Sequence, residues 1–236
     1  MNSVVAKLSA VIDSARILTD ANQLDGLAWD ALSEGRIHPR HQPELAPPLC
    51  AVIPISADEV QRVVRLANAE KIPLVPFGGG SGLMGGALSI RSGIVLDLRR
   101  MNRIVEIDNE ARVAHVQAGV VLEALDQELN RAGFILGHDP WTVPVATVGG
   151  AISTNSVGYR AGIYGSMGEQ VLGLEAVSPI GEIYRTRAVA KHSAGIDLNS
   201  LLVGGEGCFG VITEATIRIF PKPEAQLLSG YRFASF

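Results

Sequence analysis

The sequence predicts an α+β fold made of two subdomains that share one long cleft. The first half alternates strand and helix patterns, which is typical of a small parallel sheet of the βαβ kind. The second half predicts a larger, mostly antiparallel sheet with flanking helices, since its strand patterns follow one another at hairpin spacing. Glycine-rich stretches occur at 73–88, 137–165 and 204–217.

The composition limits the class of protein. Of the 236 residues, 47% are hydrophobic and 19% charged, a globular balance rather than a disordered one. A formal net charge of −4 without any basic run argues against nucleic-acid binding. Cys50 and Cys208 stand far apart, which favours a reducing, cytoplasmic environment. Charged residues interrupt the apolar start of the chain, so we expect no signal peptide and no transmembrane segment.

The N-terminal part, 1–45, predicts two helices followed by a proline-rich surface connection. In the first helix, one face would carry Leu8, Val11, Ile12 and Ala15. This face is expected to pack on the rest of the protein.

The segment 46–105 is expected to form the first subdomain. Short apolar runs predict three strands: 50–55, 72–76 and 93–98. Ser56 followed by Glu59 predicts a capping box at the start of a helix that ends near Lys71. The strand–helix–strand order predicts that the first two strands form a parallel pair with a right-handed crossover.

The segment 106–236 is expected to form the second subdomain. A hairpin is predicted around Asn109 and Glu110, and a helix over 120–132 that Gly133 ends. Strand patterns then follow on both sides of the turn at 179–181, and again at 209–220. The passage 137–165 is too apolar for disorder, and structureless loops of this length are usually functional.

The stretch 73–88 holds six glycines directly after a predicted strand. Glycine allows positive φ angles and the close approach of a ligand to the main chain, so successive amides could surround an anion. No Gly-Lys-Ser/Thr follows, which excludes a Walker loop, and no helix starts at once, which argues against a Rossmann fingerprint. From these residues alone, a phosphate-binding loop and a plain turn remain open.

Taken together, the glycine-rich stretches resemble the FAD-binding (PCMH-type) domain of the vanillyl-alcohol oxidase/p-cresol methylhydroxylase flavoprotein family. The resemblance covers nearly the whole chain and is strongest to the 2-hydroxy-acid (glycolate/D-lactate) oxidase or dehydrogenase branch. The matching motifs are ARILTDANQL, PFGGGSGLMGG, DPWTVPVATVGGAISTNSVG and GGEGCFGVITEATIRIFPKPE.

The resemblance implies three groups of residues that bind FAD. Main-chain amides would clasp the diphosphate at Gly78, Gly79, Gly80, Ser81, Gly82 and Leu83. Contacts to the flavin and polar contacts nearby would come from Pro140, Thr142, Val145, Ala146, Thr147, Gly149, Gly150, Ser153, Thr154, Asn155 and Gly158. The dinucleotide would run along Glu206, Gly210, Val211 and Ile212. Some family members link FAD to a histidine in the first loop, but 77–83 contains none, so we expect non-covalent FAD.

The resemblance also implies the activity, that of an FAD-dependent oxidoreductase acting on a small 2-hydroxy acid. Full family members continue into a cap domain over the flavin, so this chain is expected to be a fragment or a subunit whose partner supplies the cap. On its own it would not be fully active, and no catalytic residue or metal site is assigned. Alternatives are an alkyl-dihydroxyacetonephosphate synthase-like enzyme, a non-catalytic FAD-holding subunit, and a domain whose glycine loops bind nothing.

Individual charged and histidine side chains give weaker indications. His38 and His41 are expected on the surface, and His115 on a strand facing solvent. His138 is the histidine nearest the expected cofactor and a candidate to touch flavin or substrate. Arg160 could pair with a substrate carboxylate or stay solvated.

Overall fold

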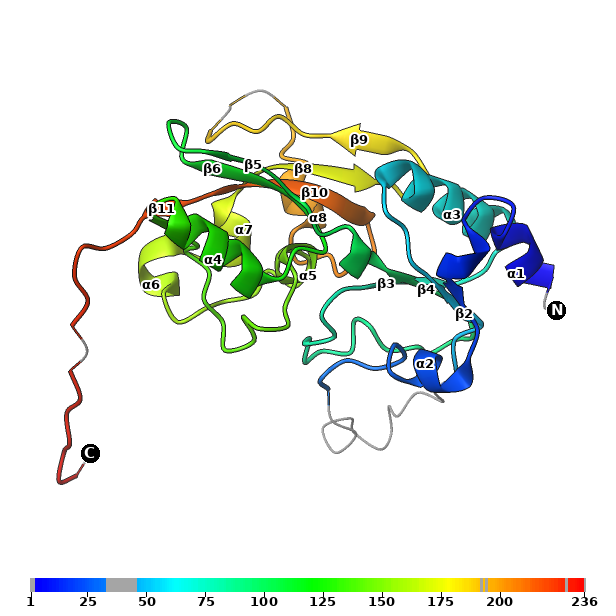
Figure 1. Ribbon diagram of the computed structural model, residues 1–236, viewed down its shortest axis with the longest axis horizontal. Coiled ribbons are helices and arrows are strands. Elements are labelled where there is room, and N and C mark those ends of the chain that lie inside the picture. Colours follow the sequence, from blue (N-terminus) through cyan, green and yellow to red (C-terminus); the bar gives the residue numbers. More distant parts are fainter. Residues whose placement is uncertain (1–2, 33–45, 192, 194, 228, 236) are drawn as a thin grey trace.

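The computed structural model describes residues 3–32, 46–191, 193, 195–227 and 229–235. Figure 1 shows two sheets with helices packed against them, and a C-terminal segment that leads away from the body after β11. The predicted α+β class, with a small sheet containing parallel strands and a larger antiparallel sheet, is confirmed.

The first sheet has the order β1-β2-β4-β3. Its strands are β1 (Ile17–Leu18), β2 (Cys50–Val52), β4 (Ile94–Asp97) and β3 (Leu74–Phe77). The strands β2 and β3 are parallel, but they are not the adjacent pair that the sequence predicted, because β4 lies between them. Every residue of β4 is buried, and a strand covered on both faces takes the centre of a parallel sheet.

The N-terminal helix is shorter than its apolar pattern predicted. The helix α1 (Ser3–Leu8) ends early, and a 3-10 turn, η1 (Ser14–Arg16), follows. Asp13 causes this turn, since its carboxylate accepts the N–H of Ala15 at 3.0 Å. Leu8 and Ile12 are buried as expected, whereas Ala15 is exposed, so its predicted place on the buried face is wrong. The second helix, α2, spans Ala21–Asp25.

The helix α3 (Ala57–Ala69) begins at Ser56, whose hydroxyl accepts the N–H of Glu59 at 3.3 Å. The other half of the predicted capping box differs. The Glu59 carboxylate accepts the N–H of Ile55 at 2.9 Å instead of that of Ser56, and it also forms a two-pronged ion pair with Arg16. Glu59 therefore ties the N-terminal segment to the start of α3. The predicted buried stripe of this helix is present: Val60, Val63, Val64 and Ala67.

The second sheet has the order β5-β6-β10-β8-β9, and all its neighbours are antiparallel. Its strands are β5 (Ile104–Asp108), β6 (Val113–Gln117), β10 (Val211–Arg218), β8 (Val171–Val177) and β9 (Ile183–Arg185). The hairpins predicted around 109–110 and 179–181 are confirmed. A separate short pair joins β7 (Phe134–Ile135) to β11 (Phe220–Pro221).

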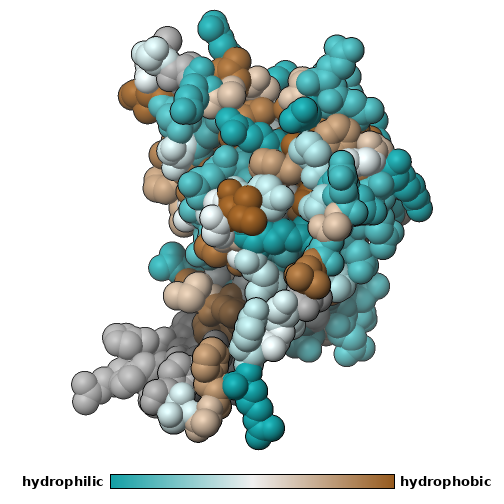
Figure 2. All heavy atoms as spheres, turned by 90° about the vertical axis from the view of Figure 1, so that its left-hand side faces the viewer, coloured by the Kyte–Doolittle hydropathy of each residue, from teal (hydrophilic) through white to brown (hydrophobic). Residues whose placement is uncertain are grey.

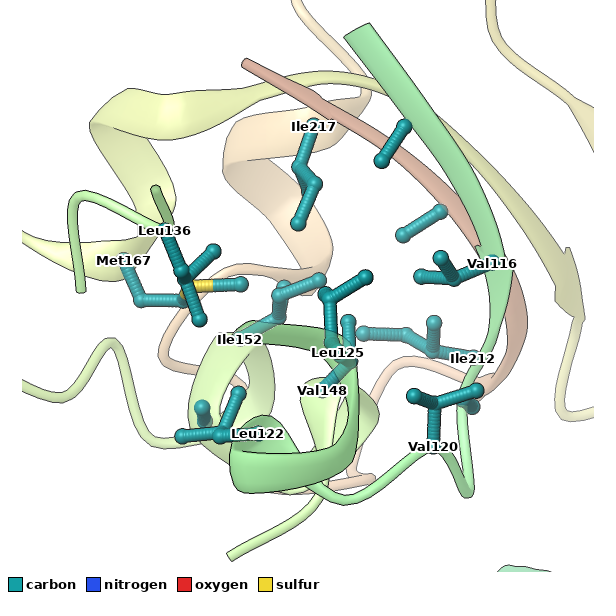
Figure 3. Close-up of a cluster of buried hydrophobic side chains, with 14 of the residues drawn as sticks. Val116, Val120, Leu122, Leu125, Leu136, Val148, Ile152, Met167, Ile212 and Ile217 are labelled. Atoms are coloured by element: carbon teal, nitrogen blue, oxygen red, sulfur yellow. The ribbon is translucent and has the colours of Figure 1, made fainter. Parts of the chain in front are cut away.

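The main core lies between this sheet and the helices packed on one of its faces. These helices include α4 (Leu122–Arg131), α5 (Val148–Ser153), α7 (Met167–Gln170) and α8 (Asn199–Leu202). Figure 3 shows Leu125 and Ile152 from the helices facing Val116, Ile212 and Ile217 from the strands. The passage 137–165 is thus not one loop, since it contains α5 and α6 (Ala161–Tyr164).

The two sheets are joined by α3 and by a main-chain contact. Val177 and Val211 of the second sheet pack in the same core as α3, and Arg65 donates from Nε to the carbonyl of Gly181 at 2.8 Å. The N–H of Gly119 donates to the carbonyl of Met101 at 2.8 Å. The chain passes from one sheet to the other just before β5, so the boundary placed at 105/106 falls inside that strand. The division into 1–45, 46–105 and 106–236 stays a proposal.

Across the described part of the chain, no helix has the length and apolar character needed to cross a membrane.

Cys50 is buried in β2, and this burial raises the pKa of its thiol to about 11. Cys208 is a free, exposed thiol. The proline-rich connection, with His38 and His41, lies outside the described residues.

Replacing Glu59 by Gln is expected to destabilise the protein by about 2 kcal/mol, since it leaves Arg16 without its carboxylate. The hydrogen bond from Arg16 holds the pKa of Glu59 below its ordinary value of 4.5. The stability from this pair is therefore present above pH 4.5 and lost as the pH falls through the lowered folded-state pKa. Urea unfolding of wild type and Glu59→Gln at neutral and acidic pH measures both effects.

The matched control is Glu70→Gln. Glu70 pairs with Lys7 at 2.6 Å, but the two side chains are 36% and 48% exposed. An exposed ion pair contributes little to stability, so the unfolding free energy of this variant should stay within about 0.5 kcal/mol of wild type. Equal losses in the two variants would contradict the role given to Glu59.

Candidate functional site

One cleft of about 340 Å³ is lined by all three glycine-rich stretches. The residues come from the loop after β3, from the passage around α5, and from the segment that leads into β10. Segments far apart in the sequence therefore form three walls around one space, as the sequence predicted.

The first wall is the loop after β3, where glycine is required by close packing. A Cβ on Gly79 would lie 2.1 Å from the carbonyl oxygen of Val145, and one on Gly78 would lie 2.5 Å from Oγ1 of Thr147. Gly80 also has a φ of +63°. Because its main chain lies directly against the second wall, the loop is a fixed surface rather than a flexible connector.

The second wall is built around the start of α5. Thr147 is 2% exposed, and its hydroxyl accepts the N–H of Gly150 at 3.3 Å, which caps the helix. On the other side, a Cβ on Gly149 would lie 2.7 Å from the Cβ of Ala118. The small residues let α5 lie against both the glycine loop and the end of β6.

The third wall runs from Glu206 to Ile212. Glu206 has a φ of +45°, which is uncommon for a residue with a side chain. Its carboxylate lies against the first wall, since a Cβ on Gly86 would be 2.0 Å from Oε2 of Glu206. Gly210, with a φ of +150°, then leads into β10.

Most of the predicted FAD-binding residues line this cleft. They are Gly78, Gly79, Gly80, Ser81, Gly82, Leu83, Pro140, Thr142, Ala146, Thr147, Gly149, Gly150, Ser153, Thr154, Glu206, Gly210, Val211 and Ile212. That each of them contacts FAD stays a prediction.

Three predicted residues do not line the cleft. The Val145 side chain is 51% exposed, and its carbonyl packs against Gly79. Asn155 turns to α7, where its Oδ1 accepts the N–H of Gly168 at 3.0 Å. Gly158 lies against Asp139, whose main-chain N would be 2.7 Å from an added Cβ. These residues support the walls from behind.

Several lining residues escaped the sequence analysis because they lie outside the glycine motifs or carry ordinary side chains. They include Asp30, Phe77, Leu98, Ala118, Trp141 and Ser156. Asp30 and Glu206 are the charged residues among the described lining residues, and no Lys, Arg or His occurs there. An anion in this cleft would therefore be held by main-chain N–H groups and hydroxyls rather than by side-chain cations.

His138 lies behind the cleft wall rather than in it. It is 1% exposed, and its Nε2 lies 2.7 Å from Oγ of Ser156, which does line the cleft. Burial lowers the pKa of His138 to about 4, so the ring is neutral at pH 7. The structure therefore does not place His138 in direct contact with a ligand of this cleft.

Two other residues singled out in the sequence, Arg160 and His115, have carboxylate partners within the protein. Arg160 lies with Nε 3.1 Å from Oδ2 of Asp139, so this charge already has a carboxylate partner. His115 lies on the sheet outside this cleft, with Nε2 3.0 Å from Oε2 of Glu214. Over the described ranges, no group of three or more His, Cys, Asp or Glu is placed to hold a metal ion.

A family model described as "FAD binding domain" matches residues 48–187. This chain belongs to that family. The matched part of the FAD-binding domain includes the first two walls of the cleft, and the third wall follows it in sequence. The PCMH-type fold that the motifs resembled is also confirmed. The solved structure of p-cresol methylhydroxylase with substrate bound has a TM-score of 0.80 and 25% identity, covering 95% of this chain and 44% of that one.

Two curated relatives are similar to this chain over most of its length. Glycolate oxidase subunit GlcD of Bacillus subtilis is 38% identical over 180 residues, which are 76% of this chain and 38% of that protein. Alkyldihydroxyacetonephosphate synthase of Trypanosoma brucei brucei is 34% identical over 195 residues, 80% of this chain and 32% of that protein. The matched part of the chain thus spans about a third of the length of these relatives.

The walls of the FAD-binding domain fit an FAD molecule. FAD is long, has a diphosphate in its middle, and carries flat rings at both ends. The glycines leave main-chain surface where a Cβ would otherwise project, and the buried side chains of Phe77 and Leu98 add apolar surface. One buried carboxylate oxygen of Asp30 has no hydrogen-bond partner among the described residues, which a bound ligand could supply.

Replacing Gly79 by Ala is expected to weaken FAD binding at least about tenfold, since the methyl group would push the glycine loop away from Val145. The control is Gly162→Ala, because an added Cβ there meets nothing within 4 Å. Fluorescence titration with FAD measures both dissociation constants, and circular dichroism checks the fold. A folded Gly79→Ala variant that binds FAD like the wild type would show that this contact does not shape the site.

Proposed function

We propose that this chain is the FAD-binding half of a flavin-dependent oxidoreductase that oxidises a small 2-hydroxy acid such as glycolate or D-lactate. The observation that carries the proposal is the convergence of three glycine-dependent walls on one cleft, in a chain that belongs to the FAD-binding family. The relative that acts as a glycolate oxidase subunit supports the substrate class.

The residues of the cleft suggest how FAD would be held. Main-chain amides between Gly78 and Leu83 would bind the diphosphate, the segment from Pro140 to Thr147 would line the flavin, and Glu206 to Ile212 would run along the dinucleotide. When bound, the flavin supplies the redox chemistry by accepting a hydride equivalent. The protein's part is to fix the cofactor and to keep one face of the ring accessible to substrate.

The flavin is proposed to bind non-covalently. A covalent link needs a nucleophilic side chain such as histidine or cysteine at the ring, and the described lining residues include neither. The nearest histidine, His138, is buried behind Ser156.

The substrate side is proposed to be completed by a further domain or a partner subunit. Met84, Trp141 and Val157 line the cleft and are 81%, 70% and 67% exposed. Hydrophobic groups this exposed at the mouth of a site are typical of surfaces that another domain covers. Figure 2, which faces the left-hand side of Figure 1, shows hydrophobic residues interspersed with hydrophilic ones on that side of the molecule.

A second candidate is a relative of alkyl-dihydroxyacetonephosphate synthase, which uses FAD for ether-bond formation without net oxidation. The similarity to that enzyme favours it: a solved structure has a TM-score of 0.83 at 29% identity. A cofactor-holding subunit without catalysis of its own is the third. All three share the FAD site, so they differ in what reaches the flavin and not in this cleft.

The purified chain is expected to bind FAD, to show the flavin absorption bands, and to quench FAD fluorescence. Acid precipitation should leave a white pellet and a yellow supernatant, since the described lining residues include no histidine or cysteine that could form a covalent link. A colourless protein that leaves FAD fluorescence unchanged would overturn the FAD site. A yellow pellet would overturn non-covalent binding alone.

The substrate class is tested on the longest protein that the gene encodes, loaded with FAD and kept free of oxygen. Glycolate or D-lactate is expected to bleach the flavin absorption, because oxidation of the 2-hydroxy acid transfers two electrons to the ring. Turnover of an acyl-dihydroxyacetone phosphate with a fatty alcohol, without bleaching by any 2-hydroxy acid, would favour the second candidate instead.

A further inference from the structure

Asp30 brings a carboxylate to the edge of the glycine loop. Asp30 lies in the short segment after α2, and main-chain hydrogen bonds on both sides of Asp30 join this segment to the chain between β3 and β4. The N–H of Ala31 donates to the carbonyl of Gly82 at 2.8 Å, and the N–H of Ser89 donates to the carbonyl of Ala28 at 2.9 Å. The position of Asp30 is thus fixed by main-chain contacts, independently of its own side chain.

The two oxygens of this carboxylate have different surroundings. Oδ1 accepts the N–H of Leu32 at 2.9 Å, which orients the group. Oδ2 is buried and has no hydrogen-bond partner among the described residues, and it lies 3.5 Å from the place of a Cβ on Gly82. Asp30 also lines the cleft. A buried carboxylate oxygen without a donor is unfavourable, so the arrangement is suited to a donor that arrives with a ligand.

The chemistry of FAD limits which of its groups can be that donor. The diphosphate is excluded, because it carries negative charge and offers only acceptors. The groups bonded to either side of the diphosphate are the ribityl chain and the adenosine ribose, and both carry hydroxyls. Because Gly82 belongs to the loop proposed to hold the diphosphate, the carboxylate lies where a sugar hydroxyl next to it would be.

We propose that Asp30 is a cofactor-positioning residue whose free carboxylate oxygen accepts a hydrogen bond from a sugar hydroxyl of FAD. The proposal rests on the FAD site proposed above. The carboxylate attracts the hydroxyl-bearing part of the cofactor and repels the diphosphate, so it sets the position of FAD along the cleft. Glu206 is the other described acidic group of the cleft, and it lies against Gly86, so Asp30 and Glu206 contact different parts of the loop.

The test compares Asp30→Ala and Asp30→Asn with wild type in FAD titrations. Asp30→Ala is expected to raise the dissociation constant about 10- to 100-fold, the usual effect of losing a hydrogen bond to a charged group. Asp30→Asn should lie between, since its single oxygen is taken by the N–H of Leu32 and its NH2 group would face the ligand. Unchanged or tighter FAD binding by Asp30→Ala would overturn the proposal, because the carboxylate would then act only as a repelling charge.

One further measurement and one control variant separate positioning from a structural role. The unfolding free energy of the FAD-free Asp30→Ala variant should stay close to that of wild type, since losing the bond from Leu32 to Oδ1 is offset by removing a buried oxygen that has no partner among the described residues. A clear loss of stability without FAD would show that Asp30 supports the loop instead. Asp25→Ala is the matched control, because Asp25 is exposed at the end of the preceding helix α2 and lies outside the cleft.

Fragments of the cofactor locate the hydroxyl. If the ribityl chain is the donor, FMN binding weakens in Asp30→Ala while ADP binding does not, and the adenosine ribose gives the opposite result. Equal affinity of wild type and Asp30→Ala for both fragments would contradict a sugar contact. The wild-type titration with FAD comes first, because failure there overturns the proposed function itself, whereas failure confined to the Asp30 variants overturns this inference alone.

Discussion

The contact between two main-chain segments, the loop after β3 and the residues before α5, determines the rest of the site. At Gly78 and Gly79 the loop lies so close to Val145 and Thr147 that no side chain fits between them. This contact sets the width of the cleft, because it brings an element of the first sheet against an element of the second. Thr147 lies within this contact, and its hydroxyl caps α5. The helix α5, which packs in the core, and the loop, which faces the ligand, are therefore positioned together.

The helix α3 makes this contact possible by holding the two sheets in place. Its apolar face packs on both, through the core that includes Val177 and Val211, and its start is fixed to the N-terminal segment by the Arg16–Glu59 pair. Close approach of main chains has little tolerance for motion, since a small displacement would open the contact or create a clash. Rigid packing around α3 therefore preorganises the cleft, which lowers the ordering required when a long, flexible ligand binds.

The sequence predicted those parts of the molecule that depend on local pattern. The stripe of α3 and the hairpins follow from periodicity and composition, which act over a few residues. The glycine-rich walls were expected from the resemblance of their motifs to a flavoprotein family, since composition alone left a plain turn open. The position of β4 between β2 and β3 depends on which strand is buried on both faces, and the early end of α1 depends on the turn at Asp13. Asp30 gave no signal because a single carboxylate has no motif, and only the fold brings it beside Gly82. Motif resemblance also assigned Val145, Asn155 and Gly158 to the cofactor, although the cleft is lined by their neighbours.

The charges of the cleft indicate a division of roles within the proposed enzyme. Oxidation of a 2-hydroxy acid requires a base for the hydroxyl proton and a cation or donor for the carboxylate. The described charged lining residues, Asp30 and Glu206, lie beside the glycine loop, where they would face the cofactor and not a substrate. Arg160 is already paired with Asp139, and His138 is neutral and buried. In the proposed function, the groups that recognise and deprotonate the substrate therefore come from outside this set of residues, facing the exposed side chains of Met84, Trp141 and Val157.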